Sequence, residues 1–445
     1  MATQELVVQL NPEHYDNLTD ANAVGKTNFG KSSCQNNTGT VFAVGSDDNV
    51  VIYTSNSYET KYAVSISNPG NSNSKFGFKI AMDSPGDTII IGAPGDNRVY
   101  VFDAQDQSRT YWTQRSSGWN NNSYLGTSDY GTIHYGSDVD VAGDDDSLFV
   151  VGRPGDHKIE LWSWPNGSSA TLLKTITKSS NFGFSCKLSA DGQVVIAGGP
   201  GNYYPYGTFN YLEDNAYGNG IAHVYAKDPS SAITWTERTL PFDYTDCPTY
   251  VEYIDQTTTT IKDVTNINIE SGGTKTPLNP AFGFSVAINK DGTFISVSAP
   301  NRKCFFSAEW VNGTSYNWLT GKPVTGDIDA FGSFLFMQYD GTRIVTGNTN
   351  IENRKYWEES NTSNLHWHDL DSSTRSYCVL DWNGIYYTNY SESFNLYSFG
   401  GVPTSMSRNG EFVLFSIKYD SGIFKANEER TTGSNRTLYG GNAVF

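Results

Sequence analysis

The sequence has few basic residues and no long apolar run, and each shortage excludes a class of partner. Lys and Arg total 30 against 47 Asp and Glu, so the net charge is −17. The chain therefore lacks the basic stripe that binding to nucleic acid phosphates requires. No run approaches the roughly 18 apolar residues of a membrane-spanning helix. The opening residues, MATQELVVQLNPEHYDN, carry neither the basic nor the apolar segment of a secretory signal, so we expect no signal-directed export.

Cysteine pairs and familiar catalytic motifs are also missing. The five cysteines are odd in number and contain no CxxC spacing, which predicts neither a disulfide framework nor a zinc site. The chain has no P-loop, no GxSxG and no HExxH motif. Its carboxylates are too many and too dispersed to nominate an acid–base pair. We therefore expect a protein that is not an enzyme, with no cofactor and no metal.

The sequence does contain a repeated β-hairpin, which is clearest at residues 281–301 (AFGFSVAINKDGTFISVSAPN). An aromatic-Gly pair opens this unit, and two apolar alternating runs follow, separated by Asp291-Gly292. Asp-Gly between alternating runs predicts a hairpin, because both turn positions must tolerate a positive φ. Seven such units open near residues 29, 76, 135, 182, 282, 331 and 399.

Each unit continues into a third alternating run and, in most copies, a fourth. Examples are Arg98–Phe102 and Tyr111–Gln114. Four short antiparallel strands repeated seven times predict an all-β protein, a seven-bladed β-propeller that forms one domain over residues 1–428. Cys34 and Cys186 fall in equivalent innermost strands, where we expect small buried thiols. We expect Glu5–Leu10 to supply the outer strand of the last blade and so to close the ring.

The order of aromatic-Gly, hairpin and Gly-Ala-Pro, intact at Gly92-Ala93-Pro94, resembles the FG-GAP repeat of integrin α-subunit propellers. The short, calcium-free branch of such repeats is the most similar. In four repeats the turn shrinks to Asp-Gly or Asn-Gly, which leaves too few oxygens for calcium. Asp138, Asp140 and Asp144–Asp146 form the densest carboxylate group. We interpret them as an acidic turn, with calcium as the alternative.

Two insertions, at residues 239–280 and 348–396, break the repeat, and residues 429–445 form a tail. Loops on a rigid array are where such folds place recognition, so we expect partner contacts there; capping of blade edges is the alternative. Aromatic and histidine side chains in or beside these and other loops suit sugar stacking or the anchoring of a protein. The candidate contact residues are Tyr203, Tyr204, Tyr206, Trp310, Trp318, Trp357, His366, Trp367 and His368.

Two of these predictions carry structural alternatives. Trp112 and Trp235 lie in expected fourth strands and Trp162 ends an expected third strand; for all three, packing between blades is the preferred interpretation. His366 and His368 share one face of a strand, which suits a metal, but no third ligand is placed beside them.

A polar, Asn/Thr/Tyr-rich surface without an export signal favours a virion component, made in the host cytoplasm and displayed at the virion surface. We expect a binding or structural role in assembly or host attachment. The expected partners are capsid or tail proteins of a larger assembly and a glycan receptor. Two alternatives stay open: a cellular FG-GAP adhesion or scaffold protein at the cell surface or outside the cell, and an enzyme with a site in the central channel.

Overall fold

The computed structural model describes about two thirds of the chain, and strands are its main secondary structure. The described residues are 32–46, 48–55, 60–115, 124–126, 134–201, 218–248, 250–255, 258–263, 280–311, 313–325, 331–347, 355–358, 366–369, 377–382, 387–389, 402–409, 412–416, 426–429, 435–438 and 441–444. Within these ranges, no helix is long and apolar enough to cross a membrane.

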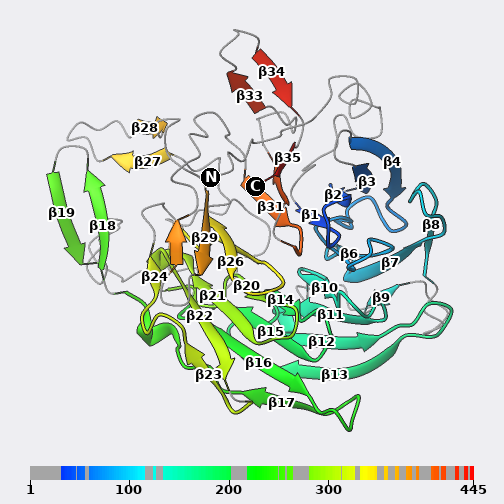
Figure 1. Cartoon of the computed structure of the whole chain (residues 1–445), viewed down its shortest axis with the longest axis horizontal. Helices are drawn as coiled ribbons and strands as arrows, with labels where there is room; N and C mark the ends of the chain where they lie inside the picture. The colour runs from blue at the N-terminus through cyan, green and yellow to red at the C-terminus, as the bar shows by residue number, and fades with distance from the viewer. Residues whose placement is uncertain are drawn as a thin grey trace, which may run out of the picture.

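Seven antiparallel sheets are arranged radially, and each is one blade of a β-propeller (Figure 1). The first four blades follow the chain in order: β1 (Ser32–Gln35), β2 (Val41–Gly45), β3 (Asn49–Ser55) and β4 (Thr60–Ser67); β5 (Lys79–Met82), β6 (Thr88–Ala93), β7 (Arg98–Ala104) and β8 (Trp112–Gln114), with β9 (Leu125–Gly126) beside β7; β10 (Val139–Val141), β11 (Leu148–Arg153), β12 (Lys158–Ser163) and β13 (Thr171–Thr177); β14 (Ser185–Leu188), β15 (Val194–Gly199), β16 (Ile221–Lys227) and β17 (Trp235–Arg238).

The remaining three blades complete the ring. They are β20 (Val286–Ile288), β21 (Phe294–Ala299), β22 (Cys304–Val311) and β23 (Ser315–Trp318), with β24 (Val324–Thr325) beside β22; β25 (Phe334–Met337), β26 (Arg343–Gly347), β29 (Tyr377–Trp382) and β30 (Tyr387–Asn389); and β31 (Val402–Met406), β32 (Phe412–Ser416) and β35 (Gly441–Val444). The prediction of an all-β, seven-bladed propeller is confirmed.

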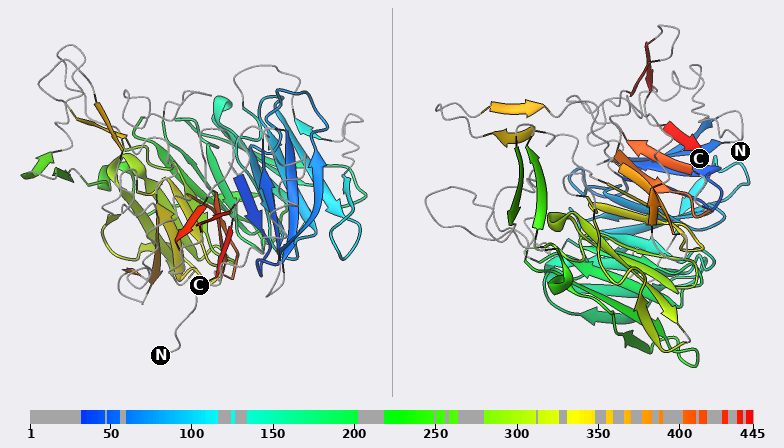
Figure 2. Two further views of the ribbon diagram at one scale, coloured as in Figure 1. Left: turned by 90° about the horizontal axis from the view of Figure 1, so that it is seen from above. Right: turned by 60° about the vertical axis from the view of Figure 1, so that its left-hand side comes forward.

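Three two-stranded hairpins stand apart from the blade sheets and project away from the blades in Figure 1 and in the right-hand view of Figure 2. They are β18 (Tyr250–Asp255) with β19 (Thr258–Asp263), β27 (Lys355–Glu358) with β28 (His366–Asp369), and β33 (Ala426–Glu429) with β34 (Asn435–Leu438). Short 3₁₀ turns are η2 (Pro154–Asp156), η3 (Tyr244–Asp246) and η5 (Pro300–Arg302).

Backbone hydrogen bonds between the first turns of neighbouring blades run around the whole ring. We call the turns that exchange these bonds the turn ring. The seven bonds, from N–H to O, are Asn37 to Ser84, Ser84 to Gly143, Asp144 to Ala190, Asp191 to Lys290, Lys290 to Tyr339, Tyr339 to Arg408 and Asn409 to Asn37. The innermost strands also contact one another in sequence, and β31 contacts β1. Blade 7 therefore meets blade 1, and the array is closed.

The repeat motif itself packs one blade on the next. The Gly92 and Gly136 backbones approach so closely that a Cβ on Gly92 would lie 2.1 Å from the Gly136 carbonyl oxygen. Gly136 also has a φ of +83°, a conformation that glycine adopts without strain. Gly152 meets Gly183 in the same way one blade later. The aromatic-Gly glycine thus contacts the Gly-Ala-Pro glycine of the preceding blade.

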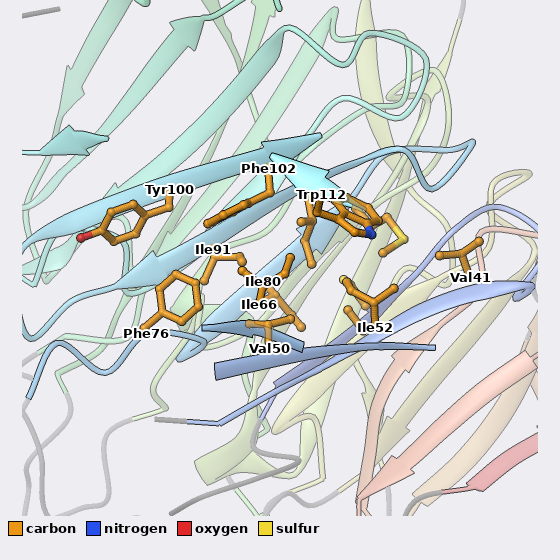
Figure 3. Packing of buried hydrophobic residues seen from close by; sticks show 14 of the residues in the cluster. Val41, Val50, Ile52, Ile66, Phe76, Ile80, Ile91, Tyr100, Phe102 and Trp112 are labelled. Atoms are coloured by element: carbon orange, nitrogen blue, oxygen red, sulfur yellow. The ribbon is translucent and has the colours of Figure 1, made fainter. Parts of the chain in front are cut away.

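Apolar residues fill the spaces between the blades, as Figure 3 shows for blades 1 and 2. The motif aromatic Phe76 is fully buried there, 5.5 Å from the Tyr100 ring and 6.3 Å from the Phe102 ring between centroids. Val50 and Ile52 of blade 1 belong to the same cluster. Because the inner strands present alternate residues to two neighbouring blades, both faces of strands such as β6 and β11 are buried, and these strands need apolar residues on each.

Two of the predicted boundaries differ from the structure. β29 and β30 lie within the predicted insertion 348–396, yet β29 pairs with β26 as the third strand of blade 6. β35 lies in the predicted tail, yet it pairs with β32 as the third strand of blade 7. Hairpins can be predicted from local sequence, but their pairing partners are set by tertiary contacts. The segment Glu5–Leu10, predicted to close the ring as an outer strand, lies outside the described residues.

Candidate functional site

Arg408 crosses the propeller axis at the turn ring. Its guanidinium donates to the Met82 carbonyl at 2.7 Å and the Val141 carbonyl at 3.3 Å, which belong to blades 2 and 3. It also donates to the Tyr339 hydroxyl of blade 6 at 2.5 Å. Since Arg408 comes from the turn of blade 7, one side chain connects four blades and occupies the axis at this end.

The surroundings of Arg408 leave it no spare room. A Cβ on Gly143 would lie 1.5 Å from the Arg408 Nη1 and 2.1 Å from the Tyr339 hydroxyl, so a side chain at position 143 would force both groups to shift. Burial alone would lower the pKa of Arg408, but Tyr339 and the Asp140 and Asp83 carboxyls outweigh it and raise that pKa. Arg408 therefore stays charged and fixed.

Charged side chains from three blades also line the wall of the channel. The Asp138 carboxylate accepts the Cys186 N–H at 2.8 Å, and Asp140 accepts the Leu188 N–H at 2.9 Å. Both bonds cap the free edge of β14, which an open sheet would leave unpaired. The Lys187 Nζ lies 3.7 Å from the Asp138 Oδ2. These carboxylates thus hold adjacent inner strands together.

Burial governs the pKa values along this wall. It raises the pKa of Asp140, against the opposing effect of Lys187 and Arg408. Desolvation by the surrounding protein also lowers the pKa of Lys79, although its side chain is exposed, and Asp138 partly offsets this effect. Lys187 differs, because Asp138 and Asp140 overcome the effect of burial and raise its pKa. Opposite charges therefore alternate along the channel, which keeps each group near a partner.

A second titratable cluster lies on the outer part of blades 3 and 4. Glu237 accepts from the Lys178 Nζ at 2.8 Å and the Tyr225 hydroxyl at 3.2 Å, and it pairs with the His223 Nδ1 at 2.6 Å. Burial alone would raise the pKa of Glu237, but the hydrogen bonds from Lys178 and His223 outweigh burial, so the pKa of Glu237 is lowered. Burial also lowers the pKa of His223. The sequence contains no motif that marks this cluster.

Two predicted contact residues pack between blades 4 and 5. The Trp318 ring lies 5.6 Å from both Phe242 and Phe306 between centroids, within a buried cluster. Trp310 is half-buried, and the Arg238 guanidinium lies 4.0 Å above its ring. Both indoles therefore already have partners within the chain, which favours a structural role for them.

The other predicted contact residues have no described side chains. Residues 355–358 and 366–369 form the β27–β28 hairpin, in which Trp357 pairs with Trp367, Tyr356 with His368 and Glu358 with His366. The backbone thus places the predicted residues Trp357, His366, Trp367 and His368 on one projecting hairpin. Tyr203, Tyr204 and Tyr206 lie outside the described residues.

The predicted burial of three tryptophans and two cysteines is confirmed. Trp112, Trp162 and Trp235 are buried between blades. Cys34 and Cys186 are buried in β1 and β14, the inner strands of blades 1 and 4.

The acidic group predicted at residues 138–146 is divided in space. Asp138 and Asp140 face β14, whereas Asp145 accepts the Ser147 N–H within its own turn at 3.0 Å. Asp146 lies 3.5 Å from the Arg115 Nη2. Across the described ranges, no group of three or more His, Cys, Asp or Glu side chains could hold a metal ion.

Sequence reasoning missed Arg408 altogether. It stands in the turn of the seventh repeat, beside the Asn409-Gly410 pair that marks the hairpin, and nothing local distinguishes it from an exposed turn arginine. Only the position of Arg408 in the folded chain, where the seven turns meet, distinguishes it.

No protein-family model matches the sequence, and no curated protein matches it. Among solved structures, a β-propeller domain of Myceliophteria thermophila Cps50 (Swd1) aligns at 9% identity and a TM-score of 0.46, covering 94% of this chain and 96% of that chain. A protein from Lactobacillus plantarum aligns at 12% identity and a TM-score of 0.44, covering 76% and 82%. Kuenenia stuttgartiensis hydrazine synthase aligns at 12% identity and a TM-score of 0.42, covering 76% of this chain and 82% of that chain.

Proposed function

We propose that this chain is a non-enzymatic binding or structural propeller that contacts its partners through the hairpins inserted into its blades. The supporting observation is the arrangement of β27–β28. Gly347 at the end of β26 pairs directly with Tyr377 at the start of β29, so blade 6 is complete without the residues between them. A segment that the fold does not need, carrying two tryptophans and two histidines, is suited to recognition.

The side chains on and around the propeller axis support the same proposal. The functional groups at the turn ring and along the wall are engaged with the backbone of neighbouring blades, as the bonds of Asp138, Asp140 and Arg408 illustrate. An enzyme with a site in the channel would need a group whose acceptor or donor capacity remains for a substrate. We therefore place partner binding on the periphery of the ring.

For the biological setting, we propose a virion surface or tail protein that acts in assembly or host attachment. The acidic, polar composition supports this proposal. The FG-GAP-like arrangement of Gly92-Ala93-Pro94 against the next aromatic-Gly pair supports kinship with that repeat family. A cellular adhesion or scaffold propeller is the second candidate, favoured by the same resemblance.

The experiment compares the full chain with a variant in which a short Gly-Ser linker replaces residues 349–375. Because Gly347 and Tyr377 are paired neighbours, a short linker can close this hairpin. Particles from the source are purified, and the copy number of each chain relative to a capsid or tail protein is measured by mass spectrometry. We expect a fixed ratio for the full chain and a loss of at least about tenfold for a folded linker variant.

The matched control replaces the half-buried Arg109 by Ala and should keep the full copy number. Recovery of the full chain only in soluble or extracellular fractions would contradict the virion setting and favour the adhesion protein. Unchanged incorporation of the linker variant would contradict the role of β27–β28. A glycan array with the same three chains then tests whether the partner is a sugar.

A further inference from the structure

Two thiols lie together at the base of the first projecting hairpin. After β17 the chain docks on blade 5, where Phe242 is buried 5.0 Å from the Phe306 ring between centroids. η3 follows, held by a capping box between Asp243 and Asp246, and it delivers the buried Cys247 into the core between blades 4 and 5. Cys304, the first residue of β22, is fully buried in the same cluster.

These two cysteines differ from the others whose side chains are described. The Cys304 thiol interacts with the Cys247 thiol, and this contact adds to the burial that raises the pKa of Cys304. Cys34 and Cys186 are each buried in an inner strand without a neighbouring thiol among the groups that act on their pKa. Only one pair in the described part of the chain is thus placed to react internally.

We propose that Cys247 and Cys304 form a disulfide cross-link when the chain meets an oxidising environment. A small-molecule disulfide such as oxidised glutathione is the oxidant. The Cys247 thiolate attacks one of its sulfurs, releasing one small thiol and forming a mixed disulfide. The Cys304 thiolate then attacks the Cys247 sulfur and releases the second small thiol, so two electrons and two protons pass to the oxidant.

The order of attack follows from burial. Cys247 is 8% exposed, whereas Cys304 is 0% exposed and its raised pKa disfavours the thiolate, so Cys247 is the sulfur that the oxidant reaches first. The bond would join residues 57 positions apart in the sequence and close a loop that contains β18–β19. A cross-link over so long a loop restricts the unfolded chain strongly. It would tie the base of this hairpin to blade 5, whatever the hairpin binds.

The test oxidises the full-length chain with oxidised glutathione, alkylates it in denaturant and counts the free thiols by mass spectrometry. We expect five alkylated cysteines in the reduced chain and three after oxidation, with a linked Cys247–Cys304 peptide pair. A protease cut within β18–β19 should leave the two fragments joined until a reductant separates them. Five alkylated cysteines after oxidation, or Cys247 held only as a glutathione adduct, would overturn the proposal.

Variants separate this pair from the other thiols. Cys304→Ser and Cys247→Ser should each abolish the linked peptide and release the fragments after the cut without reductant. Cys186→Ser, a buried cysteine in an equivalent core position, should keep both signals. If Cys304→Ser does not fold, Cys247→Ser tests the same disulfide, because it removes the more exposed of the two cysteines. A linked peptide that persists in both variants would contradict the pairing.

Discussion

Blades 3 and 7 begin alike and end differently. Both start with an inner strand and a turn that joins the turn ring, in β10–β11 and in β31–β32. Blade 3 then takes its outer strands, β12 and β13, from the residues that follow directly. Blade 7 takes its third strand, β35, from beyond the β33–β34 hairpin at the end of the chain.

The difference indicates that the inner hairpin and its turn define a blade, while the outer strands only extend it. The turn of blade 7 places Arg408 on the axis and bonds to blades 6 and 1, although this blade is the least regular. Insertions are therefore tolerated outside the inner hairpin. β18–β19 lies between two blades, and β27–β28 lies between the second and third strands of blade 6.

This division of the molecule has a functional consequence. A closed inner ring fixes seven blades in place, so elements added at the periphery are held at defined positions without contributing to closure. Recognition can then change with the inserted hairpins while the ring stays constant. The following predictions test whether inner and outer elements are as unequal as this comparison implies.

The largest effect is expected for Arg408→Ala. The substitution leaves the Met82 and Val141 carbonyls without this donor and the buried Asp140 and Asp83 without their cation. We expect the free energy of unfolding to fall by about 3–5 kcal/mol in urea titrations. Arg109→Ala breaks an ion pair with the half-exposed Asp87 and should cost less than about 1 kcal/mol. Equal losses for both variants would contradict a special role for the axis.

Gly92→Ala is expected to have the next largest effect. The new Cβ would meet the Gly136 carbonyl oxygen at 2.1 Å, and a backbone atom cannot move aside without shifting blade 3. We expect a loss of about 3 kcal/mol in thermal or urea unfolding. Gly167→Ala is the control for backbone strain alone, because nothing lies within 4 Å of its Cβ position but its φ is +74°, so it should lose only about 1–2 kcal/mol. A wild-type stability for Gly92→Ala would show that the blades pack more loosely than the motif contact implies.

Asp83 should make the stability of the ring depend on pH. Burial raises the pKa of Asp83 from 3.8 to about 6, despite N–H bonds from Gly86, Asp87 and Thr88. The folded chain therefore binds this proton more tightly than the unfolded chain does. Its contribution is full below about pH 4 and is lost as the pH rises to about 6, a change of about 2–3 kcal/mol.

The measurement is the difference between wild type and Asp83→Asn in the free energy of unfolding. It is taken from pH 3.5 to pH 7 in steps of about 0.5 pH unit. The wild type should lose stability relative to the variant over this interval. A difference that stays flat, or that rises with pH, would contradict the raised pKa of Asp83.

The smallest effect on stability is expected for the linker that replaces residues 349–375. Gly347 and Tyr377 stay paired, so blade 6 keeps all four strands. We expect the free energy of unfolding to change by less than about 1 kcal/mol. A loss as large as that of Arg408→Ala would place β27–β28 among the elements that hold the ring together.

Local patterns in the sequence predicted the inner hairpins well, because Asp-Gly turns and apolar alternation are local signals. The Asp291-Gly292 turn and the paired runs of β20 and β21 illustrate this. The outer strands of the later blades could not be predicted, since β29 and β35 are selected by the open edges of β26 and β32. The packing of Trp318 could not be predicted either, because it depends on Phe242, a residue distant in the sequence whose ring contacts the Trp318 ring.

Hydrogen exchange at the turn ring tests the closure of the propeller most directly. The seven amides that donate across blade boundaries are those of Asn37, Ser84, Asp144, Asp191, Lys290, Tyr339 and Asn409. If the ring is closed as described, all seven should exchange only through global unfolding and at one common slow rate. Exchange at least about tenfold faster at Asn409, whose amide bonds to the Asn37 carbonyl, than at Asp191 and Lys290 would mean that blades 7 and 1 separate, and would contradict a closed seven-bladed ring.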